Sequence, residues 1–157
     1  MHGGDAVFDS IHVQIGIALA VLVVGFMFTK GDEPEKIAGG FYMLVTLAGL
    51  FISDDVTRNG PLWGRMSLDI LQLVVFLGLA WHSRRAWLVW ASAFQALIVT
   101  GHILVAAQLR PPSGAFAAMN NMANYGVLVV MGVGTFWAWQ ERRVASMGSE
   151  RAKPPRL

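Results

Sequence analysis

The chain contains no cysteine, and it carries few charged side chains for its length of 157 residues. Without cysteine there is no disulfide, no thiolate metal site, no iron–sulfur cluster and no cysteine nucleophile. Charged residues make up 14% of the chain, against about 25% in soluble domains. Apolar residues make up 55%, and the mean hydropathy is +0.51. A soluble domain of this size cannot bury so much apolar surface, so the composition predicts an integral membrane protein.

Catalytic and nucleotide-binding signatures are also missing. No G-x-S-x-G, H-E-x-x-H, P-loop or Rossmann pattern occurs in the sequence. The net charge is only +2 despite a pI of 9.4, and the basic residues gather toward the C-terminus, which does not indicate nucleic-acid binding. We therefore expect a protein that is not an enzyme and whose surroundings are the lipid bilayer.

Five apolar segments follow one another, separated by short polar stretches. A helix needs about 20 residues to cross a bilayer, with a range of ~17–25. The segments extend over residues 10–29, 37–53, 66–81, 86–108 and 116–140. They predict an all-α bundle of about five transmembrane helices over residues 10–140. Residues 1–9 are expected to form a short outer tail, and residues 141–157 a basic, partly disordered tail.

A polar stretch, His82-Ser83-Arg84-Arg85, interrupts the long apolar run from Met66 to Gln108. Two adjacent arginines are too costly to place in hydrocarbon, so this stretch is expected to join two antiparallel helices at the membrane surface.

The distribution of basic residues predicts the orientation. If the N-terminus lies outside, nine of the twelve lysines and arginines fall on the cytoplasmic side and three on the outer side. The positive-inside rule then predicts an outer N-terminus and a cytoplasmic C-terminus. Arginine is more frequent than lysine, and alanine, glycine and valine are common, as in GC-rich bacterial genomes. We therefore expect a multi-pass protein of the cell inner membrane.

Polar residues within the apolar segments are the candidates for ligand binding. In the predicted orientation six of them fall in the outer half of the bundle: His12, Asp69, Gln72, Gln95, His102 and Asn124. Asp69 and Gln72 are three residues apart and share a helix face, and Gln95 and His102 belong to one stripe of the next helix. Lipid penalises such groups, so we expect them to face the bundle interior or a partner's helix.

Three functional interpretations of these residues remain open beside a structural one. His12 and His102 would ligate haem between the first and fourth helices. Asp69 and His102 would bind a quinone headgroup or relay protons. The stripe would line a path for a small solute or for protons. In the structural interpretation, the same side chains hydrogen-bond neighbouring helices to one another.

The leading hypothesis is a non-catalytic subunit, accessory protein or assembly factor of a larger membrane complex. Pairs of small residues four apart, Gly16 with Ala20 and Gly134 with Ala138, favour close helix contacts. The partner would be another membrane subunit or a second copy of the chain. The alternatives are a redox component that binds haem or quinone, and a transporter of small solutes or protons.

Overall fold

The computed structural model describes residues 11–51, 63–107, 109 and 113–151. Within these ranges all regular structure is helical, as the sequence predicted. The helices are α2 (Ile11–Lys30), α3 (Glu33–Phe51), α4 (Trp63–Ser83), α5 (Ala86–Ala106) and α6 (Ser113–Arg151). Among the described residues, three stretches are long and apolar enough to cross a membrane: Trp63–Ser83, Ala86–Ala106 and Ala118–Gly148. The apolar stretch Gln14–Lys30 of α2 is shorter. The predicted outer tail lies outside the described residues.

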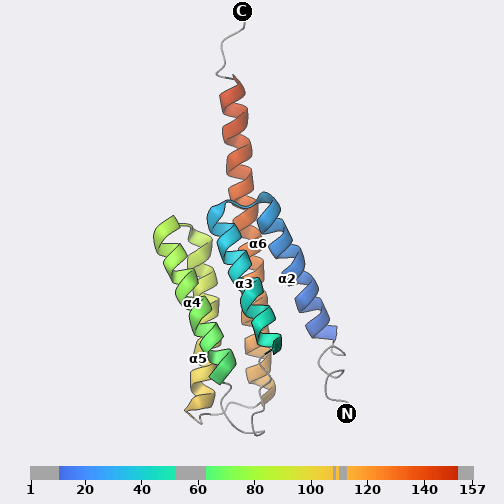
Figure 1. Cartoon of the computed structure of the whole chain (residues 1–157), viewed down its shortest axis with the longest axis vertical. Helices are drawn as coiled ribbons and strands as arrows, with labels where there is room; N and C mark the ends of the chain where they lie inside the picture. Colours follow the sequence, from blue (N-terminus) through green and yellow to red (C-terminus); the bar gives the residue numbers. More distant parts are fainter. Residues whose placement is uncertain (1–10, 52–62, 108, 110–112, 152–157) are drawn as a thin grey trace, which may run out of the picture.

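Consecutive helices run antiparallel, and α6 is central to the bundle (Figure 1). α6 packs against α5, α2 and α3, while α4 packs against α3 and α5. Only Gln72 and Phe76 of α4 are buried, so α4 forms an edge of the bundle. The last part of α6 extends beyond the ends of the other helices (Figure 1).

The junction between α4 and α5 falls where the sequence placed it. α4 ends at Ser83, and the backbone of Arg84 adopts a positive φ of 52°. A left-handed residue after the last turn is a common way to end a helix, and the N–H of Arg84 donates to the carbonyl of Ala80 at 3.0 Å. Arg85 then has an extended backbone and precedes the first residue of α5.

The junction between α2 and α3 is shorter than predicted, because α3 begins at Glu33 and not at residue 37. The Glu35 carboxylate reaches back to accept the backbone N–H of Asp32 at 3.0 Å, which is one half of a capping box. A Cβ on Gly31 would lie 2.4 Å from the carbonyl oxygen of Met27, so only glycine fits this turn.

The last helix continues past the predicted end of the fifth span. The sequence indicated a span to residue 140 followed by a basic, partly disordered tail, and α6 is helical to Arg151. Its continuation is held at its base by Glu141 and Arg142, which form ion pairs with Arg85 and Asp32 at the end of the bundle. Residues 152–157 lie outside the described residues.

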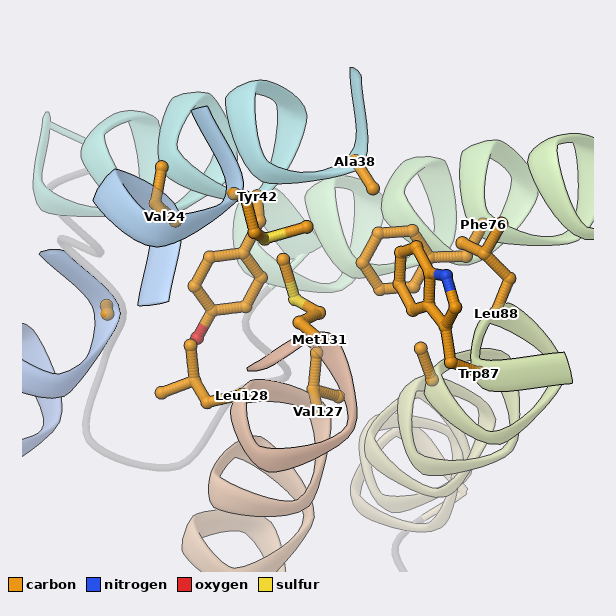
Figure 2. Packing of buried hydrophobic residues seen from close by; sticks show 12 residues of the cluster. Val24, Ala38, Tyr42, Phe76, Trp87, Leu88, Val127, Leu128 and Met131 are labelled. Carbon is orange, nitrogen blue, oxygen red and sulfur yellow. The ribbon is translucent and has the colours of Figure 1, made fainter. Parts of the chain in front are cut away.

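Aromatic side chains fill the core where helices meet. Figure 2 shows Tyr42, Phe76 and Trp87 packed with Val127 and Met131 of α6. Trp87 lies directly over Gly134, where a Cβ would meet the indole at 2.2 Å. Phe94, seven residues later in α5, lies in the same way over Gly126, at 2.8 Å from a Cβ. Glycine therefore lets α5 and α6 approach closely at these two positions, as the predicted small-residue face around Gly134 requires.

Candidate functional site

Four of the predicted polar residues form one hydrogen-bonded chain between α4 and α5. The amide of Gln72 donates to Gln95 Oε1 at 3.2 Å. Gln95 Nε2 donates to Asp69 Oδ1 at 2.9 Å and to the backbone carbonyl of Asp69 at 3.2 Å. The second carboxylate oxygen of Asp69 lies 2.9 Å from His102 Nε2. We call this set the α4–α5 polar chain.

The polar chain faces the contact between α4 and α5. Gln72 and Gln95 are buried, and the side chains of His102 and Asp69 are 12% and 22% exposed. Asp69 and His102 thus face each other between α4 and α5, as expected for side chains that face the bundle interior. Asp69 lies in the second turn of α4, whereas the helix dipole acts mainly within the first, so the hydrogen bonds from α5 are its main partners.

The chemistry of the polar chain follows from its donors and acceptors. An ionised carboxylate can only accept hydrogen bonds, so His102 Nε2 donates its proton to Asp69 Oδ2 in that state. The Gln95 amide fixes the other carboxylate oxygen, and Gln72 fixes the Gln95 amide through its oxygen. The arrangement thus orients a carboxylate–imidazole pair between α4 and α5. It equally serves to bind α4 to α5.

Asn124 does not join this chain. Its amide donates to the Asn120 carbonyl of the same helix at 2.9 Å, and it lines a separate pocket between α2, α3 and α6. The six candidates thus do not form one cluster. The backbone of His12 lies in α2, but its side chain is outside the described residues.

The groups that would form a metal site are not gathered in the described part of the chain. No three side chains among histidine, aspartate and glutamate lie close enough together there to hold a metal ion. The haem hypothesis required His12 and His102 to act as a pair of iron ligands. In the structure, the Nε2 atom of His102 lies against the Asp69 carboxylate of α4.

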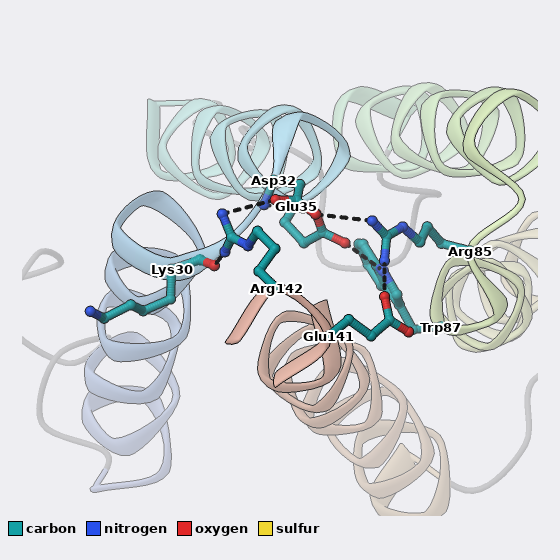
Figure 3. Close-up of polar contacts among 7 residues, drawn as sticks. All are labelled: Lys30, Asp32, Glu35, Arg85, Trp87, Glu141 and Arg142. Carbon is teal, nitrogen blue, oxygen red and sulfur yellow. Dashed lines mark hydrogen bonds and ion pairs between the residues drawn. The ribbon is translucent and has the colours of Figure 1, made fainter. Parts of the chain in front are cut away.

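An ion-pair network that the sequence analysis did not single out lies at the opposite end of the bundle (Figure 3). Asp32, in the junction before α3, accepts from Arg85 at 3.0 Å and from Arg142 at 2.9 Å. Arg85 also pairs with Glu141 at 3.2 Å, and Arg142 donates to the backbone carbonyl of Lys30. These contacts join the α2–α3 junction, the start of α5 and the middle of α6.

Beneath this network Glu35 is fully buried. One carboxylate oxygen accepts the indole N–H of Trp87 at 3.0 Å, and the other accepts the backbone N–H of Asp32. A buried carboxylate is costly unless hydrogen-bonded, so Trp87 and the Asp32 backbone offset its loss of water. A signal for the network existed in the sequence: the acidic residues around the start of α3 and the arginines at 84–85 and 142–143 fall at the same predicted end of the bundle.

The fold and the polar chain define the class of this protein: its described part is helical, with three helices long and apolar enough to cross a membrane and a hydrogen-bonded carboxylate–imidazole pair between two of them. Comparison with protein-family models, with curated proteins and with solved structures finds no match to this chain.

Proposed function

We propose that this chain is a five-span protein of the cell inner membrane that acts as a non-catalytic accessory or assembly subunit of a larger membrane complex. Its N-terminus lies outside and its C-terminus in the cytoplasm. The observation that supports this proposal is the length and surface of α6. At 39 residues α6 is about 58 Å long, whereas the hydrocarbon core of a bilayer is about 30 Å thick. A substantial part of α6 therefore stands outside the membrane.

An exposed stripe runs along α6 into this outer part. It consists of Val133, Trp137, Gln140, Val144 and Met147, which we call the α6 stripe. These residues are spaced four, three, four and three apart, the spacing of the seam between two helices in a coiled coil. Val144 and Met147 are 70% and 55% exposed, although they lie beyond the ion-pair network.

A partner helix explains why the extension carries apolar groups at that spacing. A single helical segment in water is marginally stable, and its apolar side chains gain free energy only when another surface covers them. The base of the extension is fixed, since Glu141 and Arg142 are held by Arg85 and Asp32. The α6 stripe is thus presented in a defined direction, as a docking helix of a subunit requires.

The test compares two substitutions that each introduce a lysine at adjacent residues of α6. Val144→Lys places a charge in the stripe, and Ala145→Lys places the same charge on the neighbouring face. After mild detergent extraction we expect the wild-type and Ala145→Lys proteins to migrate as a larger assembly in native electrophoresis. Val144→Lys is expected to release the chain at lower mass, because the lysine would be buried at the helix contact.

Both variants must reach the membrane in wild-type amounts for the comparison to hold. A wild-type protein that migrates as a monomer, or a Val144→Lys protein that remains in the assembly, would contradict the proposal.

A further inference from the structure

A pocket of about 220 Å³ lies between α2, α3 and α6, apart from the α4–α5 polar chain. Gly16 and Ala20 of α2 form one wall, Tyr42 of α3 a second, and residues around Asn124 of α6 the third. It lies toward the end of the bundle opposite the ion-pair network, because α2 begins and α6 begins at that end (Figure 1).

The small residues of α2 create this space. The spacing of Gly16 and Ala20 predicted a face for close helix contact. In the structure, a Cβ on Gly16 would meet only the hydroxyl of Tyr125, at 3.8 Å. The Tyr125 hydroxyl of α6 thus lies opposite Gly16 of α2, at van der Waals distance from where a Cβ would be, and both residues line the pocket.

The lining is polar but uncharged. Both tyrosines of the chain, Tyr42 and Tyr125, contribute to it, together with Asn121 and Asn124. No lysine, arginine, aspartate, glutamate or histidine is among the described lining residues. Phenol and amide groups donate hydrogen bonds to carbonyl oxygens, and an amide carries two N–H donors, of which Asn124 uses one within its own helix.

We propose that this pocket binds the neutral, carbonyl-bearing headgroup of a membrane amphiphile, while its apolar tail remains in the bilayer. Two features select this class of ligand. The lining offers hydrogen-bond donors without a positive charge, so an anionic phosphate has no counter-ion there. The volume is below the ~300–1,000 Å³ of pockets that enclose whole drug-sized ligands, so it admits a head and excludes most of the tail. This inference goes beyond the proposed subunit role and does not depend on it.

Two membrane components share this chemistry, an isoprenoid quinone and a neutral glyceride. The test titrates the full-length protein in lipid nanodiscs with a short-chain ubiquinone, with dioctanoylglycerol and with a short-chain phosphatidylglycerol, by calorimetry. We expect saturable binding of one neutral probe and no saturable binding of the anionic one. The neutral probe that binds more tightly identifies the source.

Matched glycine variants locate the binding. Gly16→Leu fills the pocket, while Gly25→Leu adds the same side chain at an exposed position of α2 with nothing within 4 Å. We expect Gly16→Leu to weaken binding at least about tenfold, or about 1.4 kcal/mol, and Gly25→Leu to leave it unchanged. If Gly16→Leu does not fold, Asn124→Leu, which removes one amide from the lining, is expected to weaken binding in the same direction.

Three results would overturn the proposal: no saturable binding of either neutral probe, equal binding of the anionic probe, or wild-type affinity in a folded pocket variant. The first would mean that water alone fills the pocket. Loss of the larger assembly in the Val144→Lys protein bears on the subunit role only, so the two proposals fail separately.

Discussion

At the scale of single residues, Gln95 has the most demanding position in the α4–α5 polar chain. Its Nε2 group donates to Asp69, and its Oε1 atom accepts from Gln72, so one side chain satisfies two residues of the neighbouring helix. Gln95 is almost fully buried, and water cannot readily replace it. Gln95 lies between Gln72 and Asp69 in the polar chain, so its side chain links two positions of α4 to α5.

We expect Gln95→Leu to destabilise the protein by about 1–2 kcal/mol, because it leaves Asp69 and Gln72 without their shared partner. The measurement is thermal or denaturant unfolding of the purified protein in detergent. Thr100→Val is the control, since Thr100 is an exposed residue of the same helix whose hydroxyl bonds only the carbonyl of Ala96. Equal stability of the two variants would show that the polar chain contributes nothing to the fold.

Side-chain identity and spacing were enough to predict part of this site. Asp69 with Gln72, and Gln95 with His102, were placed on shared faces by their spacing, and the structure brings the two faces together. The pairing of donors and acceptors was not predictable, because it depends on the rotation of α4 against α5. Asn124 was grouped with them by its depth in the membrane, but depth does not specify which helices are neighbours.

At the scale of elements, apolar length predicted the helices well and charged residues misled at their ends. The charged stretch 30–36 was interpreted as a loop up to its last lysine, yet Glu35 caps α3 from within it. The charges after residue 140 were taken as the start of a tail, yet Glu141 and Arg142 are the residues that fix α6 to the rest of the bundle. Charge next to an apolar segment thus did not mark the end of the helix.

The ion-pair network is expected to control how firmly the α6 extension is held. Asp32→Asn removes the carboxylate shared by Arg85 and Arg142. Each of these partly exposed ion pairs contributes about 0.5 kcal/mol. Losing both enlarges the population in which the α6 extension is detached from the bundle by about fivefold. We therefore expect about fivefold faster tryptic cleavage after Arg142 and Arg143 in membranes permeable to the protease.

Glu33→Gln is the matched control for this variant. It removes one negative charge from the exposed first turn of α3, within one residue of Asp32. Cleavage of this control should proceed at the wild-type rate. If Asp32→Asn is cleaved no faster than Glu33→Gln, the ion pairs do not hold the extension.

At the scale of the whole molecule, the lack of cysteine makes the orientation directly testable. Gly114 and Gly148 lie near opposite ends of α6, and a Cβ at either position meets nothing within 4 Å. They are separated by about 51 Å along the helix, more than the ~40–45 Å of a bilayer with its headgroups. Single cysteines introduced at these positions would therefore be the only thiols in the protein.

We expect a membrane-impermeant maleimide to label Gly114→Cys in intact spheroplasts and Gly148→Cys only after lysis. This pattern follows from an outer N-terminus and five crossings. The reverse pattern would show the opposite orientation. Labelling of both cysteine variants in intact spheroplasts would show that α6 does not cross the membrane.

The order of helices around the bundle was the least predictable property of the molecule. The haem hypothesis joined the first and fourth helices, whereas α2 packs against α3 and α6, and α5 packs against α4 and α6. Apolar segments that face lipid on one side and protein on the other are nearly uniform in hydrophobicity, so periodicity does not give the buried face. The close approach of α5 and α6 depends on glycines opposite Trp87 and Phe94, and each glycine is far from its aromatic partner in the sequence.

The continuity of α6 has a thermodynamic consequence. One unbroken helix carries Asn124 and Tyr125 of the pocket near its beginning and Val144 and Met147 near its end. If a bound headgroup shifts α6 between two positions against α2 and α3, a partner that prefers one position changes the affinity of the pocket. Linkage requires the effect to be reciprocal: whatever factor the partner applies to the ligand's affinity, the ligand applies to the partner's. Measuring either affinity with the other component present would give this coupling free energy.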